Sequence, residues 1–160
     1  MIKYLNKEKD FNEYLERIVV HYVDFYKNAP WSINREPEKV EEYFRHVLLL
    51  PIHSFWVELS EKDEVSGFLM AYPANFTIHF SSQENSDVSL SIDLTSESEE
   101  LWSVFIEKIK ESPFTALLSL SIGGTRIYSF LEKNNFRNIG DYKGPANKNQ
   151  CRLIIMKKVL

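Results

Sequence analysis

The chain has 160 residues, the length of one ordinary domain, and its hydrophobic (44%) and charged (26%) fractions are those of a globular protein. One cysteine, Cys151, excludes a disulfide framework, and no apolar run reaches the ~20 residues that cross a bilayer. The net charge of −4 and the lack of a dense basic stripe argue against a nucleic-acid-binding protein. Because the first residues also lack the apolar core of a signal peptide, we expect a single cytoplasmic domain over residues 1–160, with no membrane partner.

The first fifty residues contain two helix patterns after a short apolar start at residues 2–5. In the first helix, large apolar side chains recur at helical spacing on one stripe: Phe11, Tyr14, Leu15, Ile18, Val19, Tyr22, Val23 and Tyr26. Asp10 is the expected N-cap, and Pro30 ends the helix. Pro37 suits the first turn of a second helix, which Pro51 ends. We interpret the aromatic stripe as core rather than as a ligand site.

From residue 54 onward the pattern changes to strands. Residues 54–59 and 65–72 predict a hairpin around a polar turn, and residues 88–94 alternate with period two. The residues Phe76, Ile78 and Phe80 also alternate, which predicts a short extra strand. A helix over residues 101–109 is expected behind a capping box, formed by a serine and a glutamate three residues apart, Ser96 and Glu99.

The last third of the chain alternates strands with one more helix. Residues 116–122 form an apolar run suited to a central strand buried on both faces. Gly123 and Gly124 mark a sharp turn into a helix that Asn134 and Asn135 end. Two final strands are expected at residues 136–142 and 151–159. The order β, α, α, β, β, β, α, β, α, β, β predicts an α/β (α+β) fold with a mixed sheet covered by helices.

Charge and residue spacing limit the other kinds of site. The four histidines show no ligand spacing, so we expect no metal, and Cys151 in an apolar strand is expected to be a small core residue. Residues 124–160 hold eight Lys and Arg against two acids, whereas residues 1–123 hold eleven against twenty-one. This basic third either attracts an anion, such as a phosphorylated cofactor, or forms a solvated edge.

Two stretches resemble a known family. Residues 63–69 (DEVSGFL) resemble a hairpin in which a charged turn leads into an apolar-Gly-apolar strand. Residues 124–140 (GTRIYSFLEKNNFRNIG) are similar to a late helix and strand whose usual text is close to N-x-R-A-x-x-L-Y-E-K-x-G-F-x-x-x-G. With the element order, these stretches resemble the GNAT superfamily of N-acetyltransferases over residues 54–72 and 88–158. The resemblance implies a mixed, mostly antiparallel sheet flanked by helices on both faces.

The resemblance also implies acetyl-CoA in a gap between two diverging strands, with the helix between them pointing its amino end into the opening. The cofactor-binding positions implied are Ile92, Leu94, Ser96, Ser98, Gly124, Arg126, Phe130 and Lys133, and Arg137 would help hold phosphates. The family's phosphate loop reads Arg/Gln-x-x-Gly-x-Gly/Ala and falls here at residues 96–101. This loop has no glycine and no basic residue, and its three acids, Glu97, Glu99 and Glu100, oppose a bound diphosphate.

The catalytic roles implied are those of acyl transfer to an amine. The amine must lose a proton, and Asp93 or Glu58 is the candidate base. Tyr128 is the candidate acid, one turn before Leu131, where family members carry a tyrosine. A backbone N–H near Asp93 would stabilise the oxyanion.

Two functions are expected from these residues. The first is an acetyl-CoA-dependent N-acyltransferase that acts on a small-molecule or protein amine. The alternative is a catalytically inactive domain of the same fold that binds a protein partner or another ligand. Exposed aromatic residues such as Trp31 would allow a homodimer.

Overall fold

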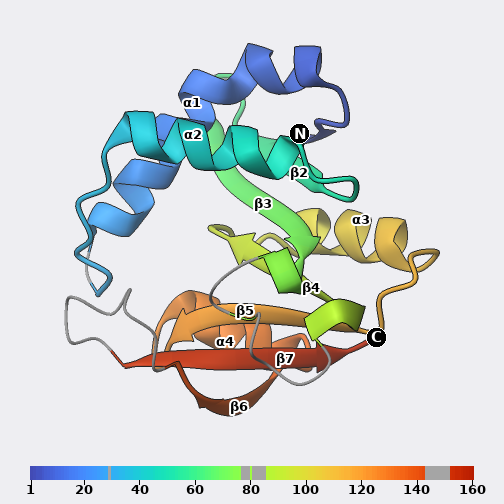
Figure 1. Cartoon of the computed structure of the whole chain (residues 1–160). Helices are drawn as coiled ribbons and strands as arrows, with labels where there is room; N and C mark the ends of the chain where they lie inside the picture. The colour runs from blue at the N-terminus through green and yellow to red at the C-terminus, as the bar shows by residue number, and fades with distance from the viewer. Residues whose placement is uncertain (29, 77–79, 81–85, 143–151) are drawn as a thin grey trace.

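The helices and strands follow one another in the predicted order (Figure 1). The structure is a computed structural model that describes residues 1–28, 30–76, 80, 86–142 and 152–160. Its helices are α1 (Glu8–Lys27), α2 (Pro37–Leu48), α3 (Glu99–Ile109) and α4 (Arg126–Lys133). Its strands are β1 (Ile2–Tyr4), β2 (Ser54–Leu59), β3 (Val65–Pro73), β4 (Ser89–Leu94), β5 (Ala116–Ile122), β6 (Arg137–Asp141) and β7 (Leu153–Val159).

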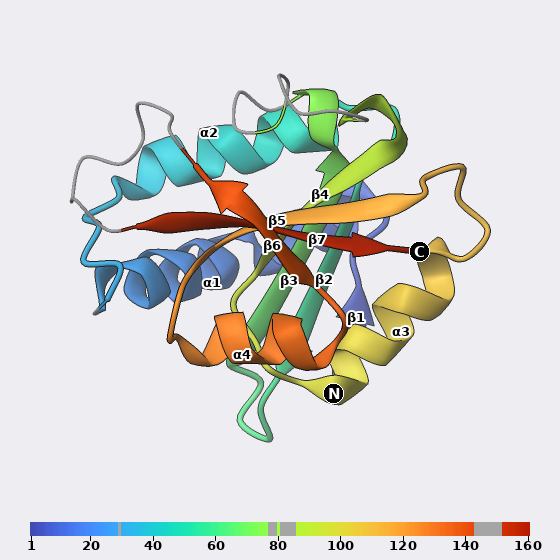
Figure 2. The ribbon, with the colours of Figure 1, turned by 90° about the horizontal axis from the view of Figure 1, so that it is seen from below.

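The described strands form one sheet in the order β1-β2-β3-β4-β5-β7-β6. Every neighbouring pair is antiparallel except β4 and β5, which run parallel with α3 as their crossover. The helices α1 and α2 cover one face of this sheet and α3 and α4 cover the other (Figure 2). The predicted mixed, mostly antiparallel sheet with helices on both faces is therefore confirmed.

The parallel strands β4 and β5 separate after three residue pairs. Their register runs from Ser89 opposite Ala116 to Ser91 opposite Leu118 and goes no further among the described residues. Beyond this point β4 still pairs with β3 as far as Leu94, and β5 still pairs with β7 through Ile122. Each strand thus keeps its outer partner while the two inner edges part. The predicted gap between diverging strands is present.

Alternation along β4 assigns its side chains to the two faces of the sheet. Leu90, Ile92 and Leu94 pack in the core under α3 and α4. The residues between them, including Asp93, point to the other face, where α1 and α2 lie. The face that a β4 residue occupies therefore decides which helix layer it meets.

The helix ends differ from the prediction at two positions. Asp10 lies inside the first turn of α1, and the N-cap residue is Lys7. The N-cap of α3 is Ser98, whose hydroxyl accepts from the Leu101 N–H, so the capping box at Ser96 was wrong. At the other end of α4 the prediction is confirmed, because Asn135 takes the left-handed conformation with φ 66°.

The structure also bears on the predicted extra strand, on Trp31, and on membrane-spanning and metal-binding segments. Residues 74–76 form a 3₁₀ turn rather than a strand, while Ile78 and Cys151 lie outside the described part of the chain. Trp31 is 8% exposed, so the expectation that it is an exposed aromatic residue was wrong. No described helix is long and apolar enough to cross a membrane. Among the described residues, no three His, Cys, Asp or Glu side chains gather as metal ligands.

Candidate functional site

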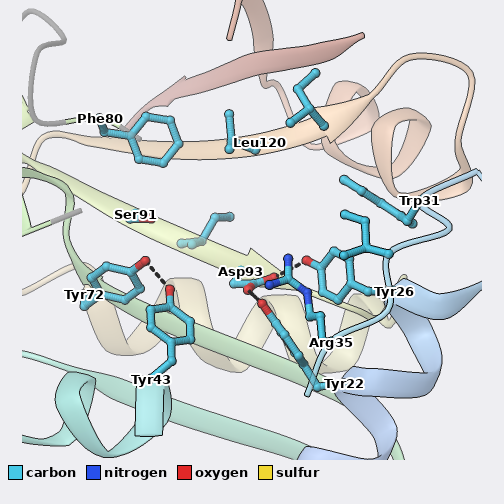
Figure 3. A pocket seen from close by; sticks show the side chains of 13 residues that line it. Tyr22, Tyr26, Trp31, Arg35, Tyr43, Tyr72, Phe80, Ser91, Asp93 and Leu120 are labelled. Carbon is cyan, nitrogen blue, oxygen red and sulfur yellow. Dashed lines mark hydrogen bonds between the residues drawn. The ribbon is translucent and has the colours of Figure 1, made fainter. Parts of the chain in front are cut away.

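A cavity of about 270 Å³ lies over the gap on the side of α1 and α2 (Figure 3). Its walls come from both helices, from the loop between them, and from strands β3, β4, β5 and β7. We call it the tyrosine chamber after four residues that line it: Tyr22, Tyr26, Tyr43 and Tyr72. The charged residues among its lining are Asp93 and Arg35.

Asp93 sits in the chamber just past the point where β4 and β5 part, and two tyrosines hold its carboxylate. The Tyr22 hydroxyl donates to Oδ2 at 2.5 Å, and the Tyr26 hydroxyl donates to Oδ1 at 2.7 Å. Both tyrosines are one turn apart on the buried stripe of α1. An ionised carboxylate has about four acceptor positions, so each oxygen keeps one for a ligand. The two hydroxyls therefore fix the orientation of the Asp93 carboxylate and leave acceptor positions on its oxygens for a ligand.

Burial keeps these tyrosines protonated. The pKa values of Tyr22 and Tyr26 lie well above the usual value, first because burial disfavours the phenolate and then because the Asp93 charge lies beside it. Each therefore acts as a hydrogen-bond donor at neutral pH. The stripe of α1 is core, as predicted, but its hydroxyls also build the site.

Arg35 comes from the loop between α1 and α2 and covers the two tyrosines. Its guanidinium lies 4.6 Å from the ring centre of Tyr26 and 5.5 Å from that of Tyr22, which is within range for cation–π attraction. The buried Nε has no hydrogen-bond partner among the described residues. Among the described residues, the Asp93 carboxylate accepts hydrogen bonds from the two tyrosines and forms no ion pair with Arg35. The chamber thus holds a separated cation and anion.

A second hydroxyl pair lies elsewhere in the chamber. The oxygens of Tyr43 on α2 and Tyr72 on β3 are 2.5 Å apart. Burial, followed by the neighbouring Tyr72, raises the pKa of Tyr43 well above its usual value. The Tyr43 hydroxyl therefore stays protonated at neutral pH, and this part of the chamber wall is aromatic and uncharged.

A separate open groove of about 400 Å³ lies beyond the carboxyl ends of β4 and β5, between the start of α3 and the α4 helix. Glu97 and Glu99 line one side, and residues 124–126, 129, 130 and 133 line the other. We call it the acidic groove. Glu97 pairs with Arg126 at 2.9 Å, and Glu99 pairs with Lys133 at 2.6 Å. The acids of the expected phosphate loop are therefore bound to the basic residues expected to hold phosphates.

The loop between β4 and α3 is anchored to the sheet through small residues. The Ser96 hydroxyl donates to Glu58 Oε2 at 3.1 Å and accepts from the Ser98 N–H. A Cβ on Gly67 would lie 2.6 Å from the Ser96 Cβ and 2.9 Å from Glu58 Oε2. Only a glycine allows this approach, which explains the apolar-Gly-apolar strand that the sequence shows.

A histidine of α1 contacts the loop between β4 and α3 from the face of the sheet that α1 and α2 cover. His21 Nε2 lies 2.8 Å from the Thr95 hydroxyl oxygen, directly after β4. Burial lowers the pKa of His21 below its usual 6.5, although the Val65 backbone and Asp24 act in the opposite direction. A neutral imidazole therefore ties α1 to the end of β4.

The structure places the expected site residues in three groups. Gly124, Arg126, Phe130 and Lys133 line the acidic groove. Ile92 and Leu94 lie on the separated part of β4, and Ile92 also lines the chamber. Ser96, Ser98 and Glu58 form the loop anchor, with Glu58 contacting Ser96 rather than the chamber. Tyr128, Arg137 and Glu100 line neither the chamber nor the groove. Asp93 is the predicted catalytic residue that lies in the chamber.

Sequence reasoning missed the residues that surround Asp93. Tyr22 and Tyr26 could have been found, because a buried tyrosine hydroxyl needs a partner and the two recur at i and i+4 on a buried stripe. Arg35 lies in a loop without periodicity, and no local pattern indicates which residues it meets. Nor did the sequence show that the acids near residue 98 meet basic residues about thirty positions later.

Comparison with known proteins gives matches in structure alone. No protein-family model and no curated protein matches the sequence. A ribosomal-protein-alanine N-acetyltransferase from Brucella melitensis matches with a TM-score of 0.69 and 18% identity over 100% of this chain and 99% of that chain. An N-acetyltransferase from Staphylococcus aureus matches with a TM-score of 0.70 and 14% identity over 99% and 98%.

A third match is a structure that contains acetyl-CoA. It is a GNAT superfamily phosphinothricin acetyltransferase from Sinorhizobium meliloti, with a TM-score of 0.69 and 12% identity over 99% of this chain and 88% of that chain. All three matches span nearly the whole of this chain, with TM-scores of 0.69 to 0.70. Together with the parted strands β4 and β5, they show that this chain has the GNAT fold.

Proposed function

We propose that this protein is an acetyl-CoA-dependent N-acyltransferase that acts on an amine held in the tyrosine chamber. The observation that carries the proposal is the separation of β4 from β5 directly beside Asp93. Ligands of α/β sheets bind at carboxyl ends of strands where the topology opens, and both hollows lie at such ends. The Sinorhizobium meliloti protein of the same fold was crystallised with acetyl-CoA, which supports this donor.

Residues on the α3 and α4 side fit acetyl-CoA in part. The free edge of β4 over residues 92–94 would lie along the extended arm of the cofactor, and Arg126 and Lys133 would hold its phosphates. For that, both basic residues must exchange Glu97 and Glu99 for phosphate oxygens. The exchange is feasible because these ion pairs are solvent-exposed and weak. Bound acetyl-CoA would supply an activated thioester carbonyl.

The residues of the chamber would act on the amine. Asp93 would accept a hydrogen bond from the amine and take the proton that the nitrogen loses as its bond to the acyl carbon forms. Tyr22 and Tyr26 would keep the carboxylate aimed, and a backbone N–H at the parted edge of β4 would stabilise the oxyanion. Tyr128, half-buried on α4, is the acid that the sequence suggests for the leaving thiolate, but it lines neither hollow and its role stays a prediction.

An activity assay tests this proposal. Release of the free thiol of coenzyme A is followed with a panel of amines, for the wild type and for Asp93→Asn. Removing the base should lower the rate about 10²–10⁴-fold. The matched control is Asp63→Asn, which changes an exposed acid paired with Arg17, and it should leave the rate unchanged. Full activity of Asp93→Asn would exclude Asp93 as the base.

The acidic groove supports a second candidate function, a catalytically inactive GNAT-fold domain that binds a protein partner or another ligand. The ion pairs of Glu97 and Glu99 already occupy the cations that phosphates need. A thermal melt separates the two functions, since a ligand at 100 times its dissociation constant adds about 2.7 kcal/mol to stability. An unchanged melting temperature at millimolar acetyl-CoA, together with no thiol release, would favour the second function.

A further inference from the structure

Arg35 has a hydrogen-bond donor that no described residue of the protein binds. The Nε atom is buried and has no partner among the described residues. A buried donor left without an acceptor is costly and uncommon in folded proteins. Arg35 also lines the chamber, so an acceptor group on a bound molecule there would meet a guanidinium that the described residues leave incompletely satisfied.

The charges of the chamber describe the molecule that would fit. Among the described residues its charged lining is one anion, Asp93, and one cation, Arg35, and Figure 3 shows both reaching the space beside Tyr22 and Tyr26. Among the described residues the two form no ion pair, and each Asp93 oxygen accepts one tyrosine hydroxyl and keeps an acceptor position for a ligand. A plain alkylamine would satisfy Asp93, yet it would bring a second cation beside Arg35 and leave Nε without an acceptor. An acceptor with both an amine and a carboxylate matches both groups.

The remaining walls indicate the rest of the acceptor. Apart from Ser91, the other described lining residues are aromatic or aliphatic, such as Phe80, Leu120 and Leu153. The volume of about 270 Å³ suits a small molecule rather than a folded chain. Arginine binds carboxylates through several parallel donors, which would fix the orientation of the acceptor as well as its charge.

We propose that the acceptor is a free α-amino acid with an apolar side chain, whose carboxylate binds Arg35 and whose amine faces Asp93. The site proposed is that of the acyl acceptor, so the role of this ligand as a substrate rests on the proposed function. The binding preference itself does not, because it can be measured without acetyl-CoA. Arg35 is then the residue that selects a free amino acid over the amino terminus of a peptide.

Two matched ligand pairs test this inference by calorimetry and thermal melts without acetyl-CoA. L-leucine is compared with L-leucinamide, and L-phenylalanine with L-phenylalaninamide; each amide keeps the amine and replaces the carboxylate, as a peptide bond would. The wild type should bind the free acid of at least one pair about tenfold more tightly, the effect of one charge-assisted hydrogen bond of about 1.4 kcal/mol. No binding, or equal or tighter binding of both amides, would overturn the inference.

Variants then assign the preference to Arg35. Arg35→Gln should reduce the ratio between acid and amide to about one, whereas Arg35→Lys, which keeps the charge over the tyrosine rings, should retain part of it. Arg45→Gln is the matched control, because Arg45 is an exposed arginine on α2 paired with Glu41 outside the chamber. A ratio that survives Arg35→Gln would overturn the inference.

The outcome also separates this inference from the proposed function. If the protein prefers the free acid but releases no thiol from acetyl-CoA, the amino-acid binding site is supported and the acyltransferase function is rejected. If thiol is released equally with simple amines and with the amino-acid amides, the acyltransferase function is supported and the selection of a carboxylate by Arg35 is rejected.

Discussion

The two ion pairs across the acidic groove give a quantitative test of how acetyl-CoA would bind. Glu97 and Glu99 carry negative charge where the phosphates would lie and also hold Arg126 and Lys133. Replacing both acids in Glu97→Gln/Glu99→Gln keeps the side-chain length, removes two charges and frees two cations. We expect this double variant to bind acetyl-CoA more tightly than the wild type.

The exposure of these side chains sets the size of the effect. The Glu97 and Glu99 side chains are 35% and 51% exposed, so a water-like dielectric applies. A unit charge about 4 Å from another is then worth about 1 kcal/mol. Two such charges give about 2 kcal/mol, which is about a 30-fold lower dissociation constant. Stability should change little, because an exposed ion pair contributes about 0–1 kcal/mol.

Calorimetric titration with acetyl-CoA at low and high salt measures this gain. Salt screens exposed charges, so the gain should shrink as ionic strength rises. The control is Glu41→Gln/Glu107→Gln, which also removes two acids and two ion pairs, with Arg45 and Lys110, outside the groove. If both double variants change the affinity equally, or if neither changes it, the acids do not oppose the cofactor and the reasoning is wrong.

Two further predictions concern the loop that follows β4. Gly67→Ala should destabilise the fold by about 1–3 kcal/mol, because its Cβ would meet Ser96 at 2.6 Å, and thermal melts should show a clearly smaller effect for Gly123→Ala, whose Cβ meets the end of the Ile154 side chain at 3.1 Å. Equal effects of the two substitutions would contradict this account of the close approach. Because burial lowers the pKa of His21 in the folded state, its contribution to stability is complete above about pH 6.5 and falls as the pH drops from 6.5 through the folded pKa. Urea unfolding between pH 7.5 and pH 5 should show a shallower loss for His21→Gln than for the wild type, whereas the exposed control His46→Gln should behave like the wild type.

Much of the fold follows from local patterns in the sequence. Helical spacing of apolar residues and period-two alternation gave every element in order, and alternation along β4 already separates Asp93 from Ile92 and Leu94. The start of α3 was predicted at Ser96 and lies at Ser98, because the hydroxyl of either serine can cap a helix. The backbone geometry chose Ser98, while the Ser96 hydroxyl bonds to the Ser98 N–H and to Glu58.

The candidate site was less predictable, because it depends on contacts between distant segments. Asp93 could be named from its place on the fourth strand, but its tyrosine partners are 71 and 67 residues away along the chain. The pairing of Glu97 with Arg126 spans 29 residues and reverses the role expected of the arginine, from phosphate ligand to ion-pair partner. Arg35 has no periodic neighbour that would place it. Such contacts become visible only when the helices are packed on the sheet.

The central claim is that acetyl-CoA binds between the parted strands. It is tested most directly by titrating acetyl-CoA into the ¹⁵N-labelled protein and following the backbone amide resonances. We predict that the largest shifts fall on residues 92–94 of β4 and residues 119–122 of β5, where the inner edges are unpaired, and on residues 97–99 at the start of α3. Shifts confined to other surfaces, or none at millimolar acetyl-CoA, would contradict it.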